Sequence, residues 1–280
     1  MNNVTHLGAG IITLQETHFK RKGKMNEKLK DFVFVDAIRK KTKGGTMIGV
    51  HKSLDPILIE EYAEDFEFLV VEVRIANKDI RIMSGYGPQE NWKIEDKMPF
   101  FKTLEEEVIK AKINNKIIYI QMDGNSKLGP DWIKGDPHEI TANGKILAEI
   151  LERQDLIVIN GLNKKCFGTI TRKRNTNKVK EESVIDFVIG CEEMVDMVAS
   201  LVIDEERKYV LTKYQKTKKG VKIQESDHNS LITQVNGVWN KKRNMKKVEI
   251  YNLKDVEGLK KFKEMTSKTN FFSEDFQNEE

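Results

Sequence analysis

Short runs rich in isoleucine, valine and phenylalanine recur along most of the chain and limit the folds open to it. Glycine, asparagine, aspartate or charged residues bound each run, and this pattern is typical of β-strands. The expected strands cover residues 10–15, 32–38, 44–50, 67–75, 79–86, 116–123, 155–160, 184–190, 199–206 and 230–235. The step at Asn77 and Lys78 predicts a hairpin turn between two of these strands. Sheets must therefore form most of the core.

Two longer segments, residues 97–114 and 142–155, have the spacing of amphipathic helices. Their apolar faces consist of Phe101, Leu104, Val108 and Ala111 in the first segment and of Ile146, Ile150 and Leu151 in the second. Many strands with few helices favour an α/β fold of two packed sheets flanked by helices over a helix bundle or a doubly wound dinucleotide fold.

The chain length of 280 residues suits one large α/β domain with an appendage. The strand-rich part is expected to form a single domain over residues 1–236. Residues 237–280 are highly charged, lack β-branched runs and carry a weak helical pattern, so a charged, partly helical connector is expected there.

The sequence also bears on the cellular compartment. No apolar run approaches the roughly 18 residues of a membrane span, and the N-terminus lacks the basic and apolar regions of a secretory signal. The two cysteines, Cys166 and Cys191, form neither a metal-binding spacing nor a disulfide framework. We therefore expect an intracellular protein in a reducing compartment, with no membrane partner.

Basic residues gather in three runs, "HFKRKGK", "TRKRNTNKVK" and "KYQKTKKGVK". Runs of this kind are more often solvated loops than binding sites. These runs stand close to acidic motifs, where a phosphate-rich ligand would need positive charge. Their placement therefore favours a nucleic-acid-binding role over that of solvated loops without a ligand.

Acidic and polar residues stand at or near the ends of several expected strands, where α/β sheets collect ligand-binding groups. They are Glu16, Asp123, Asn125, Asp186, Asp227 and His228. Asp186 lies in the apolar run "VIDFVI", so its carboxylate needs a hydrogen-bonding partner, for which a histidine is the natural candidate. Scattered carboxylates are usually surface charges, and "ESDHNS" alone equally fits a turn in which Ser226 and Asp227 cap backbone amides.

Taken in order, "LQETHF", "GGTMIGV", "SGYGPQ", "QMDGNSKLG", "SVIDFVIG" and "SDHNSLI" resemble motifs of the endonuclease/exonuclease/phosphatase superfamily. These are the Mg²⁺-dependent nucleases related to DNase I and the abasic-site endonucleases. "ITLQETHFK" and "TITRKR" are most similar to the endonuclease domain of a non-LTR (LINE-type) retrotransposon polyprotein. The resemblance implies a four-layer α-β-β-α sandwich with two mixed sheets, and DNA nicking that leaves a 3′-hydroxyl and a 5′-phosphate.

The resemblance also implies a role for each site residue. Glu16 would bind the metal ion, and Asp227 would lie beside the metal ion and the leaving group. The metal ion would be Mg²⁺, with Mn²⁺ as a substitute. Asp123 would position or deprotonate the attacking water, and Asn125 would hold the phosphate.

Phosphate binding is implied for two further residues. Tyr86 would hydrogen-bond the scissile phosphate, although a strand-end aromatic without a role explains it as well. His228 would contact the phosphate and stabilise charge in the transition state, and Asp186 would orient this histidine. Ser183 and Ser226 would support the site.

The partner implied by the resemblance is a DNA duplex, with RNA as a further ligand. The residues expected to contact it are Lys20, Arg21, Gln89, Arg172 and Arg174. In retrotransposon polyproteins a reverse transcriptase domain follows the nuclease, and its DNA target implies a nuclear location.

The sequence departs from the family pattern in three places. Met122 stands where the family usually has glycine, and Gln89 stands where an asparagine is common. The family also begins with a strand that carries a metal-site asparagine, and too few residues precede "IITLQETH" for that strand and its crossover. A truncated nuclease of weakened activity is therefore expected. Action on another phosphoester, such as RNA or a phospho-metabolite, and a catalytically dead nucleic-acid-binding remnant remain the alternatives.

Overall fold

The computed structural model describes residues 8–18, 29–37, 44–58, 67–175, 180–209, 212–217 and 220–236. From Gly10 onward these residues belong to one compact unit. The expected connector at 237–280 and the predicted contacts Lys20 and Arg21 lie outside the described residues. The domain boundary at residue 236 therefore stays a prediction.

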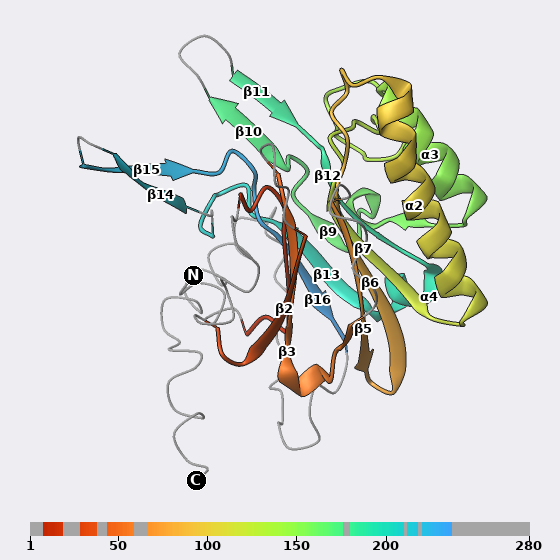
Figure 1. Ribbon diagram of the computed structural model, residues 1–280. Helices are drawn as coiled ribbons and strands as arrows, with labels where there is room; N and C mark the ends of the chain where they lie inside the picture. Colours follow the sequence, from red (N-terminus) through yellow and green to blue (C-terminus); the bar gives the residue numbers. More distant parts are fainter. Residues whose placement is uncertain are drawn as a thin grey trace. The chain divides into compact units, whose positions relative to one another are not determined.

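A six-stranded mixed sheet forms the centre of this unit (Figure 1). In spatial order its strands are β4 (Ile57–Leu58), β5 (Phe68–Ile75), β6 (Lys78–Tyr86), β7 (Ile117–Asp123), β12 (Asp186–Gly190) and β8 (Ile157–Val158). The β6–β7 pair is parallel, and the other neighbours are antiparallel. The ends of β6 and β7 consequently meet at the same edge of the sheet.

Side chains alternate across the central sheet because successive residues of a strand point to opposite faces. On one face, Val70, Met83 and Ile120 pack with residues of α2 (Ile94–Ile113) and α3 (Ala142–Arg153). On the other, Val71 and Ile82 belong to a separate apolar cluster that includes a second layer of strands. Both long helices cover the same face, so they form one of the two helical layers expected.

Two three-stranded sheets make up the second layer. One contains β1 (Ile11–Leu14), β3 (Thr46–His51) and β2 (Phe32–Ala37), and the other contains β16 (Leu231–Val235), β13 (Val198–Ile203) and β9 (Cys166–Phe167). The expected α/β sandwich of packed mixed sheets is thus confirmed. Within the described residues no strand precedes β1, and β1 and β16 are both edge strands.

Two of the basic runs differ from the expectation of solvated loops. They form β-hairpins, β10 (Arg172–Asn175) with β11 (Lys180–Ser183) and β14 (Thr212–Thr217) with β15 (Gly220–Glu225). In the first hairpin two of the three basic residues of β10 face an acidic residue of β11: Lys173 pairs with Glu182 and Arg174 with Glu181, whereas Arg172 faces Ser183. Opposite charges across a ladder stabilise strands that have no apolar face.

Smaller elements differ from the sequence-based expectations in detail. The turn between β5 and β6 lies at Ala76 and Asn77, one residue earlier than expected, and both have left-handed φ angles of 52° and 63°. The strand expected at 155–160 is reduced to β8 and continues as the 3-10 turn η2 (Ile159–Gly161). A short helix, α4 (Glu192–Met197), and the 3-10 turn η1 (Lys52–Leu54) were not expected. None of the described helices has the length and hydropathy that a membrane-spanning segment requires.

Candidate active site

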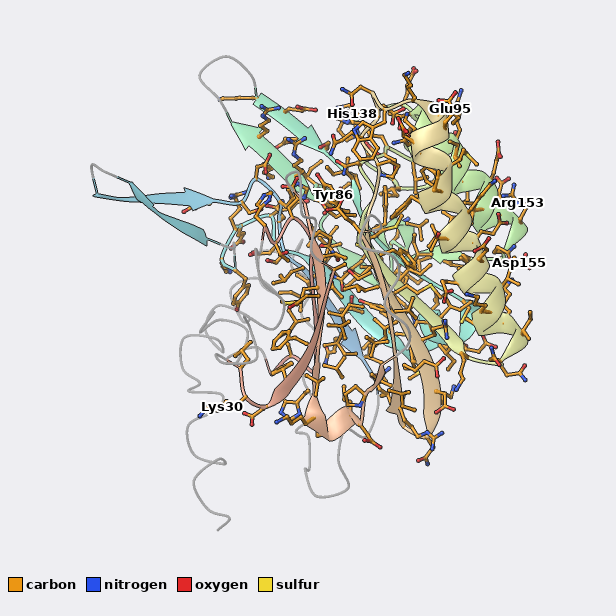
Figure 2. The ribbon with its side chains drawn as sticks, viewed as in Figure 1. Lys30, Tyr86, Glu95, His138, Arg153 and Asp155 are labelled. Atoms are coloured by element: carbon orange, nitrogen blue, oxygen red, sulfur yellow. The ribbon has the colours of Figure 1, made fainter. Side chains whose placement is uncertain are left out.

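Three predicted site residues lie side by side on adjacent strands of the central sheet. Tyr86 at the end of β6 is in register with Asp123 at the end of β7, and Asp123 is in register with Asp186 at the start of β12. In Figure 2, Tyr86 lies near the top of the strand layers and Lys30 near their bottom. The site therefore occupies one edge of the sheet.

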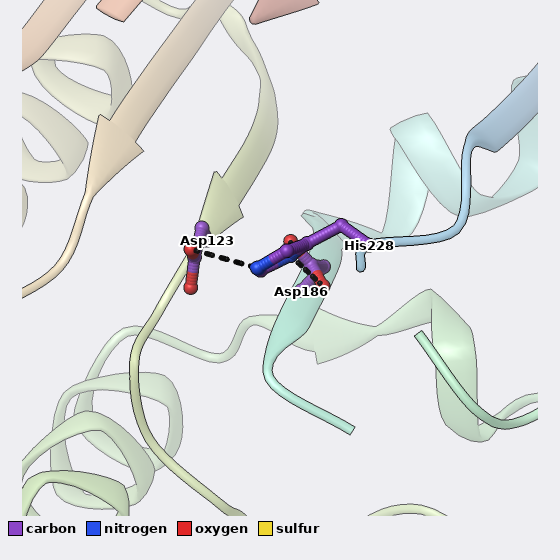
Figure 3. Close-up of side chains that lie close together, drawn as sticks. All are labelled: Asp123, Asp186 and His228. Atoms are coloured by element: carbon purple, nitrogen blue, oxygen red, sulfur yellow. Dashed lines mark hydrogen bonds and ion pairs between the residues drawn. The ribbon is translucent and has the colours of Figure 1, made fainter. Parts of the chain in front are cut away.

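His228 joins this group from the segment between β15 and β16. Its Nδ1 lies 3.0 Å from both carboxylate oxygens of Asp186, which accept the hydrogen bond. Its Nε2 lies 3.9 Å from Oδ2 of Asp123. Figure 3 shows the imidazole between the two carboxylates. The sequence-based expectation that Asp186 has a histidine partner thus agrees with the geometry.

The electrostatics of this group are dominated by burial and crowded negative charge. Burial and the charge of Asp186 raise the pKa of Asp123 to about 8. Burial alone would lower the pKa of His228, but Asp186, followed by Asp123 and Asp227, raises it to about 10. The local field thus favours a bound proton or cation.

Asn125 is held in an uncommon backbone conformation beside Asp123. Its φ is 44°, its backbone N–H donates to Oδ1 of Asp123 at 2.9 Å, and its side-chain amide donates to the carbonyl of Gly87 at 2.8 Å. A Cβ atom at Gly87 would lie 2.3 Å from the carbonyl oxygen of Gly124, so this close approach requires glycine. The loop that carries Asn125 is thereby locked against the end of β6.

Glu16 and Gln89 meet at the hydroxyl group of Tyr86. The hydroxyl donates to Oε1 of Glu16 at 2.5 Å and accepts from Nε2 of Gln89 at 3.0 Å. Burial and the Glu16 carboxylate raise the pKa of Tyr86. Glu16 itself is exposed, and its segment is tied down where the N–H groups of Thr17 and His18 donate to Gly45 and Gly44.

The Asp227 carboxylate accepts a hydrogen bond from Nε of Arg172 at 2.9 Å. Burial alone would raise the pKa of Asp227, but Arg172 and His228 hold it below its usual value. Arg172, predicted to contact nucleic acid, therefore also contacts a predicted metal residue. Arg174, two residues further along β10, is exposed.

The residues present fit a divalent cation. Ligand atoms of Asp123, Asp186 and His228 lie within 4.8 Å of one another, and hard cations such as Mg²⁺ prefer carboxylate oxygens. The predicted metal residues Glu16 and Asp227 are not part of this cluster. Glu16 contacts Tyr86, and Asp227 contacts Arg172 and lies 4.0 Å from Nε2 of His228. The pKa of the buried Asp123 is raised partly because the negative charge of Asp186 lies close to it, and a bound cation would offset this charge.

Supporting residues include two that sequence analysis missed. Thr171 and Asn160 are buried and hydrogen-bond the backbone around Asp186. The position of Asn160 at the end of the apolar run "DLIVIN" was a signal that could have identified it. Of the predicted supporting residues, Ser226 accepts a hydrogen bond from the backbone N–H of His228 at 3.1 Å. The buried hydroxyl of Ser183 has no hydrogen-bond partner among the described residues.

Known structures share this fold at low sequence identity. The endonuclease domain of TRAS1, a telomere-specific non-LTR retrotransposon, matches with a TM-score of 0.55 and 18% identity, over 84% of this chain and 89% of that chain. A 3′–5′ exonuclease (NExo) from Neisseria meningitidis matches with a TM-score of 0.60 and 14% identity, over 84% and 92%. An AP endonuclease from Archaeoglobus fulgidus matches with a TM-score of 0.57 and 15% identity, over 84% and 92%. No protein-family model and no curated protein sequence matches the chain.

Proposed function

We propose that this chain, which has the DNase I-like fold of the endonuclease/exonuclease/phosphatase superfamily, is a divalent-metal-dependent endonuclease that nicks DNA. The observation that carries the proposal is the placement of His228 between Asp186 and Asp123 at the edge of the sheet. A base, a hydrogen-bonded imidazole and a tyrosine hydroxyl gathered at one edge of the sheet can serve the hydrolysis of a phosphodiester.

Asp123 is the proposed base. Its raised pKa, about 8, keeps the carboxyl largely protonated near neutral pH when no cation is bound; a cation beside it would lower this pKa and free the carboxylate to take a proton from water. His228, charged and oriented by Asp186, would donate a hydrogen bond to a phosphate oxygen and stabilise the negative charge that develops there. Tyr86 would donate a hydrogen bond to the same phosphate once its hydroxyl turns away from Glu16, to which it donates in this structure.

Glu16 and Asp227 are the residues proposed to hold Mg²⁺, or Mn²⁺ in its place. Glu16 contacts Tyr86, and Asp227 lies 4.0 Å from Nε2 of His228. When bound, the cation would neutralise charge on the phosphate and the leaving oxygen. Asn125 would hold the phosphate through its side-chain amide, which now donates to Gly87.

DNA is the proposed substrate, and a non-LTR retrotransposon is the proposed origin. The TRAS1 domain supports both, since it is an endonuclease of this fold. The basic residues of β10 support a polyanionic ligand, because they lie next to the site. Arg172, the first residue of β10, forms a β-bridge with His228, and Arg174 follows on the same strand. A reverse transcriptase domain in the parent polyprotein and a nuclear location belong to the same proposal.

Relaxation of supercoiled plasmid tests the proposal. The wild-type protein should nick the plasmid with Mg²⁺ and lose this activity in EDTA, and Asp123→Asn should lower the rate by about 10²–10⁴-fold, as expected for a lost base. Asp196→Asn, on the exposed side of α4, is the matched control and should keep the wild-type rate. A folded wild-type protein that binds DNA in a salt-dependent manner without nicking would instead identify a nucleic-acid-binding remnant. Cleavage of RNA alone would redirect the substrate assignment.

A further inference from the structure

We infer that Thr171 is a positioning residue that holds Asp186 and His228 in their hydrogen-bonded arrangement. Thr171 lies immediately before β10 and has no exposed surface. It therefore cannot touch a substrate, and any effect on the reaction must act through the residues it holds. Its importance for catalysis depends on the proposed nuclease function, whereas its effect on geometry does not.

The hydroxyl of Thr171 supports the backbone that carries Asp186. Its Oγ1 accepts hydrogen bonds from the N–H groups of Ile185 at 3.0 Å and of Asp186 at 3.1 Å. These N–H groups stand where the chain enters β12, and Ile185 precedes the strand. Buried N–H groups need acceptors, and here one side chain supplies both.

The backbone of Thr171 supports the segment that carries His228. Its carbonyl oxygen accepts the N–H of Asn229 at 2.6 Å. The side-chain amide of Asn229 donates to the carbonyl of the preceding Ile170 at 2.7 Å. The residue that follows His228 is therefore fastened twice to the segment that contains Thr171.

One buried residue thus joins two segments that are distant in sequence, with the Asp186–His228 contact between them. The side chain of Asn160, by contrast, supports β12, where it contacts the carbonyl of Asp186 and the N–H of Val188. Loss of the Thr171 hydroxyl would free two N–H groups and let the start of β12 shift relative to His228. A misplacement of about 1 Å weakens hydrogen bonds and can slow catalysis about 10²-fold.

The test compares Thr171→Val, which keeps the side-chain shape without the acceptor, with Thr171→Ser, which keeps the hydroxyl. The first readout is the downfield proton NMR signal of the hydrogen-bonded Nδ1–H of His228, recorded without metal or DNA and assigned with His228→Gln. The second readout is plasmid nicking, with kcat and KM measured separately. We expect Thr171→Val to lose or shift the signal and to lower kcat about 10- to 100-fold at similar KM, and Thr171→Ser to restore both.

Val108→Ala on α2 provides the control for general destabilisation, since Val108 is buried among the residues that face the helices. It should lower the unfolding temperature but leave the NMR signal and kcat unchanged. If a folded Thr171→Val protein behaves like Val108→Ala, Thr171 is only structural and the inference fails. Should Thr171→Val not fold, Thr171→Cys, whose sulfur is a weak acceptor, takes its place. If the wild type does not nick DNA, the proposed function fails, and the NMR comparison still decides the role of Thr171.

Discussion

Asp123 and Asp186 are directly opposed on the antiparallel strands β7 and β12. Two buried carboxylates in register repel each other, so one retains a proton or a cation lies near both. The imidazole of His228 supplies this positive charge, with Nδ1 on Asp186 and Nε2 towards Asp123. Only Asp186 hydrogen-bonds the imidazole, and burial beside this second carboxylate raises the pKa of Asp123.

Replacement of Asp186 by asparagine should lower the pKa of His228, because its strongest electrostatic partner is then neutral. The amide would no longer stabilise an imidazolium, and the nicking rate should fall at least about 100-fold. Titration of the His228 ring protons by NMR would measure the pKa. An unchanged pKa in a folded protein would contradict the assignment of Asp186 as the orienting residue.

Stability without metal should depend on pH through His228. Its folded-state pKa is raised from 6.5 to about 10, so the folded protein binds this proton more tightly than the unfolded chain does. The resulting stabilisation is complete below the unfolded-state pKa of 6.5 and is lost as the pH rises through about 10.

The pKa of Asp123 is also raised, from 3.8 to about 8, and acts in the same direction at lower pH. Urea unfolding in EDTA at a series of pH values would measure both effects. His228→Gln should remove the decline at the alkaline end. Parallel stability curves for the variant and the wild type would show that His228 does not titrate as described.

Two variants that each lack one tyrosine hydroxyl distinguish a role in catalysis from a role in stability. Tyr86→Phe should reduce nicking and weaken Mg²⁺ binding, because Glu16 and Gln89 lose their shared partner. The matched control is Tyr119→Phe, whose hydroxyl donates to Thr233 on the second layer of strands. That variant should lose about 0.5–1.5 kcal/mol of unfolding free energy while keeping its nicking rate. Equal activity losses in the two variants would argue against a specific role for Tyr86.

Arginine substitutions on β10 should have different effects on binding and on rate. Arg172→Ala and Arg174→Ala should each weaken DNA binding and, if they contact phosphates, reduce the salt dependence by about one charge. Arg172→Ala should also lower the single-turnover rate, because it releases the Asp227 carboxylate. Binding measured at several salt concentrations and single-turnover nicking distinguish these effects. A rate unaffected by Arg172→Ala would mean that its ion pair with Asp227 does not matter for catalysis.

The sequence alone determined which segments form the main strands and helices, because apolar periodicity reflects local backbone geometry. It also identified Asp186 as a buried carboxylate in need of a partner and His228 as a candidate. The charged hairpin of β10 and β11 escaped prediction because its strands have no apolar face. The stability of β10 and β11 comes from cross-strand pairing, which a single segment does not reveal.

Only the tertiary structure decided the arrangement of the site. Strand register places Tyr86, Asp123 and Asp186 on one rung, and a period of two cannot specify register between strands. The contact between Asp186 and His228 spans 42 positions of the chain. Likewise, the roles of Arg172 and Thr171 depend on neighbours that are distant in sequence. Local pattern shows which side chains are buried, but long-range packing selects the groups they meet.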